Sequence, residues 1–120
     1  MSKVLVVDDE RVVCQLIANY LKKFGLKVFT AFDGNQALQL IDQEKPELVL
    51  LDIAMPIGMD GIQVLRELHK RKVSVKVIMV SGFLTDEFIN EAKALGAIDF
   101  LHKPVKREVL KDVVLSHLKK

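Results

Sequence analysis

Acidic residues stand directly after apolar runs at two points far apart in the chain. Asp8 and Asp9 follow the run Val4–Val7, and Asp52 follows the run that ends at Leu51. Two interpretations are open for such a pair of aspartates. Asp is a good helix N-cap and suits the positive end of the helix dipole. Three carboxylates that converge would instead repel one another and form a site for a cation.

A hydroxyl and an ammonium group stand at corresponding places later in the chain. Ser81 follows the apolar run 76–80, and Lys103 follows the run 98–101. Hard carboxylate oxygens select Mg²⁺ or Mn²⁺. A carboxylate such as Asp52 is also a known nucleophile for phosphoryl groups, whose charged oxygens would be matched by the metal, by Lys103 and by Ser81. If the fold brings these groups together, we expect phosphoryl-transfer chemistry at Asp52, since a lone buried carboxylate there would be costly.

The elements that must position these groups alternate regularly. Short apolar runs rich in Val, Leu and Ile alternate five times with amphipathic helical patterns, which favours parallel strands covered on both faces. The runs lie at 4–7, 27–30, 47–51, 76–80 and 98–101. Five such units predict an α/β fold: a flavodoxin-like, doubly wound, five-stranded parallel sheet in the order 2-1-3-4-5, with five helices. The first and third strands then meet at the switch point, where such sheets bind ligands beyond the carboxyl ends of their strands.

The helical patterns carry recognisable start and stop signals. Asp33 and Asp60 are each followed by Gln three residues later, as in a capping box with Asp in place of Ser or Thr. Thr85 opens the fourth helix, and Gly25 and Gly96 follow the first and the fourth.

Composition narrows the class of protein. The 120 residues are half hydrophobic, which predicts one domain spanning 1–120. The formal charge of +2 is too mild to indicate nucleic-acid binding. Cys14 is the only cysteine, so an internal disulfide is excluded, and its apolar neighbours predict a buried thiol. No run approaches a membrane span and no signal-peptide pattern opens the chain, so we expect a cytoplasmic protein. Lys70, Arg71 and Lys72 are interpreted as a solvated helix end.

Four fragments taken together resemble the receiver domain of two-component response regulators: VLVVDDE, LVLLDIAMP, VIMVSG and GAIDFLHKP. The resemblance covers essentially the entire chain. It implies that Asp52 accepts a phosphoryl group from a histidine kinase or a histidine phosphotransfer protein. It also implies that Asp9, Asp52 and the backbone carbonyl of Ala54 bind Mg²⁺, with Asp8 acting mainly through water.

The same resemblance implies roles for three later residues. Ser81 and Lys103 would bind the phosphoryl group, and Phe100 would take the position of an aromatic switch residue. The chain departs from the usual pattern in having Ile57 as an apparent extra residue, and Phe83 as a bulky side chain two residues after Ser81. Phe100 also lacks the hydroxyl of the more common Tyr.

Three classes of function compete for this constellation. The first is a phosphorylation switch, with at most weak self-phosphorylation and self-dephosphorylation. The second is a hydrolase of the haloacid-dehalogenase kind, which needs an acid where this chain has Ala54. The third is a flavin-binding protein, whose phosphate Asp8 and Asp9 would repel. The switch is favoured, and its output would be a protein contact through the fourth helix, fifth strand and fifth helix.

Overall fold

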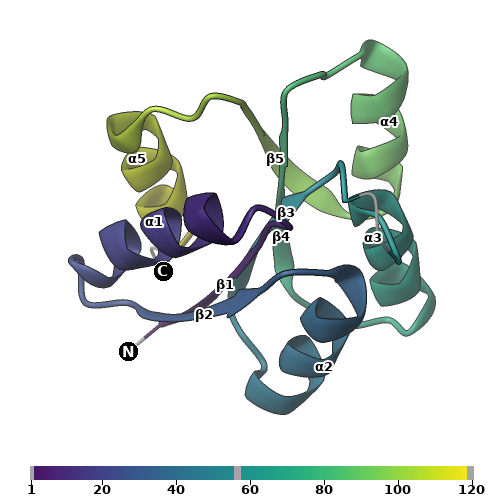
Figure 1. Cartoon of the computed structure of the whole chain (residues 1–120). Helices are drawn as coiled ribbons and strands as arrows, with labels where there is room; N and C mark the ends of the chain where they lie inside the picture. Colours follow the sequence, from purple (N-terminus) through teal and green to yellow (C-terminus); the bar gives the residue numbers. More distant parts are fainter. Residues whose placement is uncertain (1, 56–57, 119–120) are drawn as a thin grey trace.

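The computed structural model describes residues 2–55 and 58–118, and within them five strands alternate with five helices (Figure 1). The strands are β1 (Lys3–Val7), β2 (Lys27–Ala31), β3 (Leu48–Asp52), β4 (Lys76–Ser81) and β5 (Ala97–His102). The helices are α1 (Arg11–Lys22), α2 (Gly34–Glu44), α3 (Gly61–Lys70), α4 (Asp86–Ala94) and α5 (Arg107–Leu118). No helix in this part of the chain has the length and apolar character needed to cross a bilayer.

All strand pairs are parallel, and the strand order β2-β1-β3-β4-β5 confirms the predicted topology. The strands run slightly further than the apolar runs indicated. Asp52 and Ser81 are the last residues of β3 and β4, where the sequence predicted that they would follow the strand. Their backbones remain in the ladder after the apolar run has stopped: Asp52 is in register with Val80, and Ser81 with His102. The sheet itself therefore fixes both residues.

Helices cover both faces of the sheet, which accounts for the apolar character of both sides of each central strand. One buried cluster joins β1, β3 and β4 to Cys14 and Leu21 of α1 and to Leu110 of α5. The other joins the opposite side of the sheet to α2, α3 and α4, for example through Ile41 and Leu65. Figure 1 shows α1 and α5 together on one side of the sheet and the other three helices on the other side. The prediction that Cys14 is buried is confirmed.

The predicted helix starts are found at three sites. Asp60 forms a complete capping box with Gln63, through two bonds of 2.9 Å. Asp33 forms half of one, because its carboxylate accepts from Gln36 N at 2.8 Å while the Gln36 side chain accepts from Phe32 instead. Thr85 caps α4 at 3.2 Å. The cap of α1 is Glu10 and neither of the preceding aspartates.

Gly61, the first residue of α3, brings this helix against the end of β3. Its N–H donates to the carbonyl oxygen of Ile53 at 3.0 Å. A Cβ atom at Gly61 would overlap the carbonyl oxygen of Asp52 and lie 2.8 Å from the Cα of Ile53. The absence of a side chain at this position therefore sets the path of the backbone that carries Asp52.

We predict that Gly61→Ala destabilises the fold by about 1–3 kcal/mol, because overpacking against rigid backbone forces a shift. Gly82→Ala is the matched control, since its Cβ would meet its nearest atom only at 4.0 Å. Thermal melts followed by circular dichroism measure both. Equal melting temperatures for the two variants would contradict the close approach of α3 to β3.

Candidate functional site

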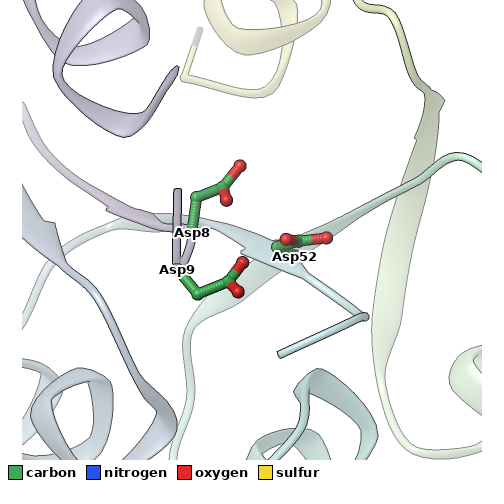
Figure 2. Close-up of side chains that lie close together, drawn as sticks. All are labelled: Asp8, Asp9 and Asp52. Atoms are coloured by element: carbon green, nitrogen blue, oxygen red, sulfur yellow. The ribbon is translucent and has the colours of Figure 1, made fainter. Parts of the chain in front are cut away.

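Three carboxylates converge at the carboxyl ends of β1 and β3, as the sequence predicted. Asp8 and Asp9 lie in the β1–α1 connection, and Asp52 ends β3. One oxygen from each lies within 4.8 Å of the others (Figure 2). Asp8 and Asp52 are each only 3% exposed, whereas Asp9 is half-buried. Carboxylates that are this close together and largely buried from solvent repel one another strongly unless cations balance their charge.

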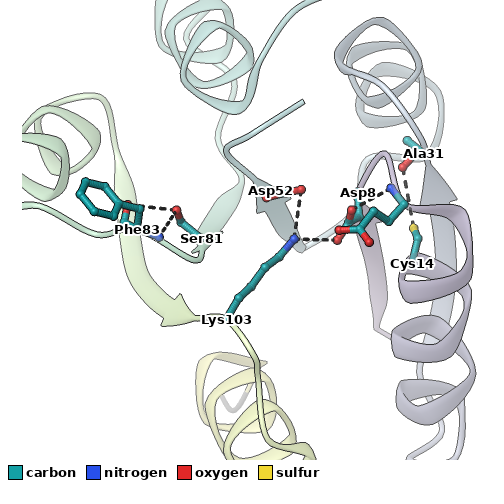
Figure 3. Close-up of polar contacts among 8 residues, drawn as sticks. Asp8, Cys14, Ala31, Asp52, Ser81, Phe83 and Lys103 are labelled. Atoms are coloured by element: carbon teal, nitrogen blue, oxygen red, sulfur yellow. Dashed lines mark hydrogen bonds and ion pairs between the residues drawn. The ribbon is translucent and has the colours of Figure 1, made fainter. Parts of the chain in front are cut away.

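Lys103 supplies one such cation from the end of β5. Its Nζ lies 3.2 Å from Oδ2 of Asp8 and 3.2 Å from Oδ2 of Asp52 (Figure 3). The Lys103 backbone N–H donates to the carbonyl oxygen of Ser81 at 2.8 Å, which fixes the start of this side chain beside the end of β4. The four groups Asp8, Asp9, Asp52 and Lys103 therefore form one cluster drawn from three strand ends.

The buried, charged surroundings of Asp52 raise its pKa. Burial and the charge of Asp8 raise the pKa of Asp52 from 3.8 to about 6, although Lys103 and a backbone hydrogen bond from Ala54 act in the opposite direction. Lys103 alone therefore leaves the Asp52 carboxylate short of positive charge. Further positive charge at this position would stabilise the ionised form of Asp52.

The pKa of Lys103 is raised by the same cluster. Burial alone lowers the pKa of this ammonium, but the charges of Asp52 and Asp8 outweigh burial and raise the pKa above 10.5. Lys103 is therefore a permanent cation at neutral pH.

Local hydrogen bonds hold Asp8 in place. Its backbone N–H donates to the carbonyl oxygen of Ala31 at 3.1 Å, and its Oδ1 accepts from the backbone N–H of Glu10 at 2.9 Å. Asp8 thus organises the entry to α1 in addition to facing Lys103. Asp8 is not the N-cap of α1, which is Glu10, and its side chain joins the β1–α1 connection to the charged cluster.

Ser81 stands at the same edge of the sheet, but its hydroxyl is turned toward the following loop. Its Oγ accepts from the backbone N–H of Phe83 at 3.0 Å and donates to the carbonyl oxygen of Phe83 at 3.1 Å (Figure 3). Phe83 is 77% exposed. This serine–backbone turn follows the path of the β4–α4 loop.

The remaining candidate residues lie outside the charged cluster. Phe100 is half-buried and packs against the cluster of apolar residues beneath α2, α3 and α4. Its backbone N–H donates to Oδ1 of Asp99 at 2.8 Å, and Oδ2 of Asp99 lies 2.8 Å from Nε2 of His117 in α5. No role for His117 was predicted from the sequence. Ala54 is exposed just beyond β3, and Ile57, the apparent extra residue, lies outside the described residues.

The donor set fits a hard divalent cation. Carboxylate oxygens from Asp8, Asp9 and Asp52 are the ligands that Mg²⁺ and Mn²⁺ take, and Mg²⁺ needs only one or two of them beside water and phosphate oxygens. The raised pKa of Asp52 agrees with such a site, because burial and the charge of Asp8 together outweigh the effect of Lys103.

Comparison with known proteins agrees with this arrangement. The family described as the response regulator receiver domain matches residues 4–115. The sporulation initiation phosphotransferase F of Bacillus subtilis is 35% identical over 117 residues, which are 98% of this chain and 94% of that protein. The structure of Vibrio cholerae chemotaxis protein CheY4 is similar with a TM-score of 0.90 at 29% identity, covering 97% of this chain and 98% of the other. The receiver domain of NtrX from Brucella abortus has a TM-score of 0.87 at 38% identity, covering 96% and 97%.

The chain therefore belongs to the response regulator receiver domain family, and it is a receiver domain of two-component signalling. The fold, the order of the strands and the place of the acidic cluster at the switch point all agree with this assignment.

The raised pKa of Asp52 predicts a pH dependence of stability in metal-free protein. Between pH 3.8 and about 6 the folded chain holds a proton on Asp52 that the unfolded chain has released. Folded protein then binds more protons, so the free energy of unfolding falls as pH rises through this window, by up to about 3 kcal/mol from this group. Chemical denaturation of wild type and Asp52→Asn at several pH values measures the difference. Parallel profiles for the two proteins would contradict the shift.

We predict that Asp9→Ala weakens Mg²⁺ binding at least about tenfold, because Mg²⁺ relies on few protein carboxylates. In metal-free protein the same change raises stability by about 1 kcal/mol, because it relieves repulsion by Asp8 and Asp52. Asp42→Ala, at an exposed position on α2, is the control. Calorimetric titration with Mg²⁺ and metal-free thermal melts test the two parts, and a lower melting temperature for Asp9→Ala would contradict the repulsion.

Proposed function

We propose that this receiver is a phosphorylation-dependent signalling switch whose acceptor is Asp52. The phosphoryl group comes from a histidine kinase or a histidine phosphotransfer protein in the cytoplasm. The observation that carries the proposal is the environment of Asp52, a buried carboxylate at the end of the central strand β3, 3.2 Å from a permanent cation and beside two further acids. Such a group is poised to attack a phosphorus atom and has no comparable structural role.

The chemistry is one displacement at phosphorus. An oxygen of Asp52 forms a bond to phosphorus while the N–P bond of the donor phosphohistidine breaks and its electron pair returns to the imidazole nitrogen. Lys103 already touches Asp52 and neutralises charge on the transferred group. Ser81 at the end of β4 offers its hydroxyl to another phosphoryl oxygen once it releases Phe83. The product is an aspartyl phosphate.

Asp9, Asp52 and the backbone carbonyl of Ala54 are the residues that would hold Mg²⁺, or Mn²⁺ in its place, with Asp8 acting through water. A bound Mg²⁺ supplies positive charge to the carboxylates and to the phosphoryl oxygens. The closeness of the three carboxylate oxygens supports this ligand set. The same residues support no more than weak self-phosphorylation from small donors, because a free donor is not oriented by a partner surface.

The donor protein docks beside the site, on α1. Val12 and Leu16 of this helix are 74% and 62% exposed, an unusual degree for large apolar side chains. A groove of about 600 Å³ runs between α1 and α5 and reaches Lys103, lined by apolar side chains such as Ile17 and Leu110. A histidine-bearing helix seated here brings its phosphoryl group to the acceptor.

The output face comprises α4, β5 and α5, and its contact is with a protein and involves neither nucleic acid nor a membrane. Ser81 links the site to this face. When its hydroxyl hydrogen-bonds a phosphoryl oxygen, it gives up its hydrogen bonds to the backbone of Phe83 and so releases the β4–α4 loop. Phe100, already half-buried on β5, then packs further inward. A ligand shifts such an equilibrium only through its different affinity for the two states.

The acceptor assignment predicts that Mg²⁺ and acetyl phosphate add a single phosphoryl group to the protein. Intact-mass measurement shows this addition in wild type and its loss in Asp52→Asn. Asp60→Asn is the matched control, since Asp60 caps α3 outside the acidic cluster. Equal labelling of wild type and Asp52→Asn would reject Asp52 as the acceptor.

The phosphoryl lifetime is predicted to be long. Neither Ala54 nor the Phe83 side chain can hydrogen-bond the water that attacks phosphorus, and positioned polar help is typically worth about 10²-fold or more. Ala54→Asn is therefore expected to speed phosphate release, by several-fold up to about 10²-fold. Release is followed on purified phosphorylated protein, with Ala94→Asn, exposed on α4, as the control. An unchanged or slower rate in Ala54→Asn would contradict this account of the lifetime.

A further inference from the structure

A second concave surface lies at the opposite end of the strands from Asp52, where β3 and β4 begin. Its central hollow, about 310 Å³, is floored by apolar side chains that include Leu68 and Val73. It shares these two residues with a hollow of about 350 Å³ that extends to Gly96, after α4. It shares Asp42 and Arg71 with a hollow of about 400 Å³ that extends to Asn35 on α2. The three hollows form one elongated surface, called here the basic groove.

The charge of the basic groove is one-sided. Lys45 and Arg71 line its centre, and Lys72 lines the part toward α4. Asp42 is the one acidic residue among the described residues that line it. Arg71 uses its Nε in a 2.9 Å bond to Glu67, which leaves the other donors of its guanidinium for a ligand. The predicted solvated helix end is confirmed, because Lys70, Arg71 and Lys72 are all exposed at the end of α3, and Arg71 and Lys72 also line a concave surface.

Two of these basic residues have an unfavourable backbone conformation. Lys45 has φ 49° and Lys72 has φ 56°, and they are the positive-φ residues other than glycine in the described chain. Glycine or asparagine fills such left-handed positions in most helix ends. A lysine at a helix end also suits the helix dipole, so the charges alone carry no inference. Both strained lysines border the same groove, however, and backbone strain of this kind concentrates at functional sites.

We propose that the basic groove binds an extended acidic peptide segment of a partner protein. The elongated shape suits an extended chain, and the apolar side chains of the peptide pack on Val73, which is 39% exposed at the apolar floor. The carboxylates of the peptide contact Lys45, Arg71 and Lys72 at the rim of the groove. Such charge complementarity gives the interaction its specificity. A compact anion would pair with the basic residues but leave the apolar floor of the groove exposed to solvent. The site is separate from Asp52 and acts as an anchor independent of phosphorylation.

The test uses the full chain and a fluorescein-labelled peptide in which Glu alternates with Leu, followed by fluorescence anisotropy. The comparison peptide has Lys in place of every Glu. We expect only the acidic peptide to bind, with an affinity that falls as salt rises. Lys45→Asn with Lys72→Asn removes two charges while keeping residues that tolerate left-handed backbone, and is expected to weaken binding about fivefold to tenfold. Lys22→Asn, exposed on α1, is the matched control.

Further outcomes separate this proposal from the phosphorylation switch. Asp52→Asn is expected to bind the acidic peptide as wild type does, and amide shifts on binding are expected at Val73, Ser74 and Gly96. Equal binding of the two peptides, or unchanged binding by the double lysine variant, would overturn the proposal. Full displacement by inorganic phosphate would overturn the peptide class in favour of a small-anion site. Shifts confined to β5 and α5 would overturn the location.

Discussion

The ammonium group of Lys103, held 3.2 Å from carboxylate oxygens of both Asp8 and Asp52, is the interaction on which the site depends. It joins the ends of β1, β3 and β5, and it balances only part of the negative charge gathered there. Burial, together with the charge of Asp8, still raises the pKa of Asp52 to about 6. A bound divalent cation would relieve this repulsion and would also offset the charge of a phosphoryl group on Asp52, so the same unfavourable charge that weakens the metal-free fold favours metal binding.

Other features connect this charged centre to the surfaces that partners would touch. Ser81 is hydrogen-bonded to the backbone of Phe83, so movement of its hydroxyl would change the β4–α4 loop directly. Beyond it, Asp99 accepts from Phe100 N and pairs with His117, which fastens β5 to the end of α5. The basic groove lies at the other end of the sheet and shares none of these contacts. The molecule thus separates a surface that would respond to phosphorylation from one that would not.

The sequence predicted the features that depend on local pattern. Apolar runs that stop at Asp52 and Ser81 located the strand ends, and the spacing from Asp60 to Gln63 located the start of α3. Contacts set by loop paths were not predictable. The register of β5 skips Ile98 against β4, and this irregularity precedes the residue, Asp99, that pairs with His117. No periodicity in the sequence encodes such a step. The basic groove was missed for a similar reason, because a run of lysine and arginine does not reveal the concavity beneath it.

The central claim is that loading Asp52 moves Ser81 and thereby Phe83 and Phe100. Amide and aromatic NMR spectra, recorded with Mg²⁺ before and after addition of beryllium fluoride, test it most directly. We expect the Phe83 amide to lose its bond to the Ser81 hydroxyl and shift strongly, and the Phe100 ring to become more buried, with both changes absent in Ser81→Ala. Shifts confined to the neighbours of Asp52, with the Phe83 amide and the Phe100 ring unchanged, would contradict the account.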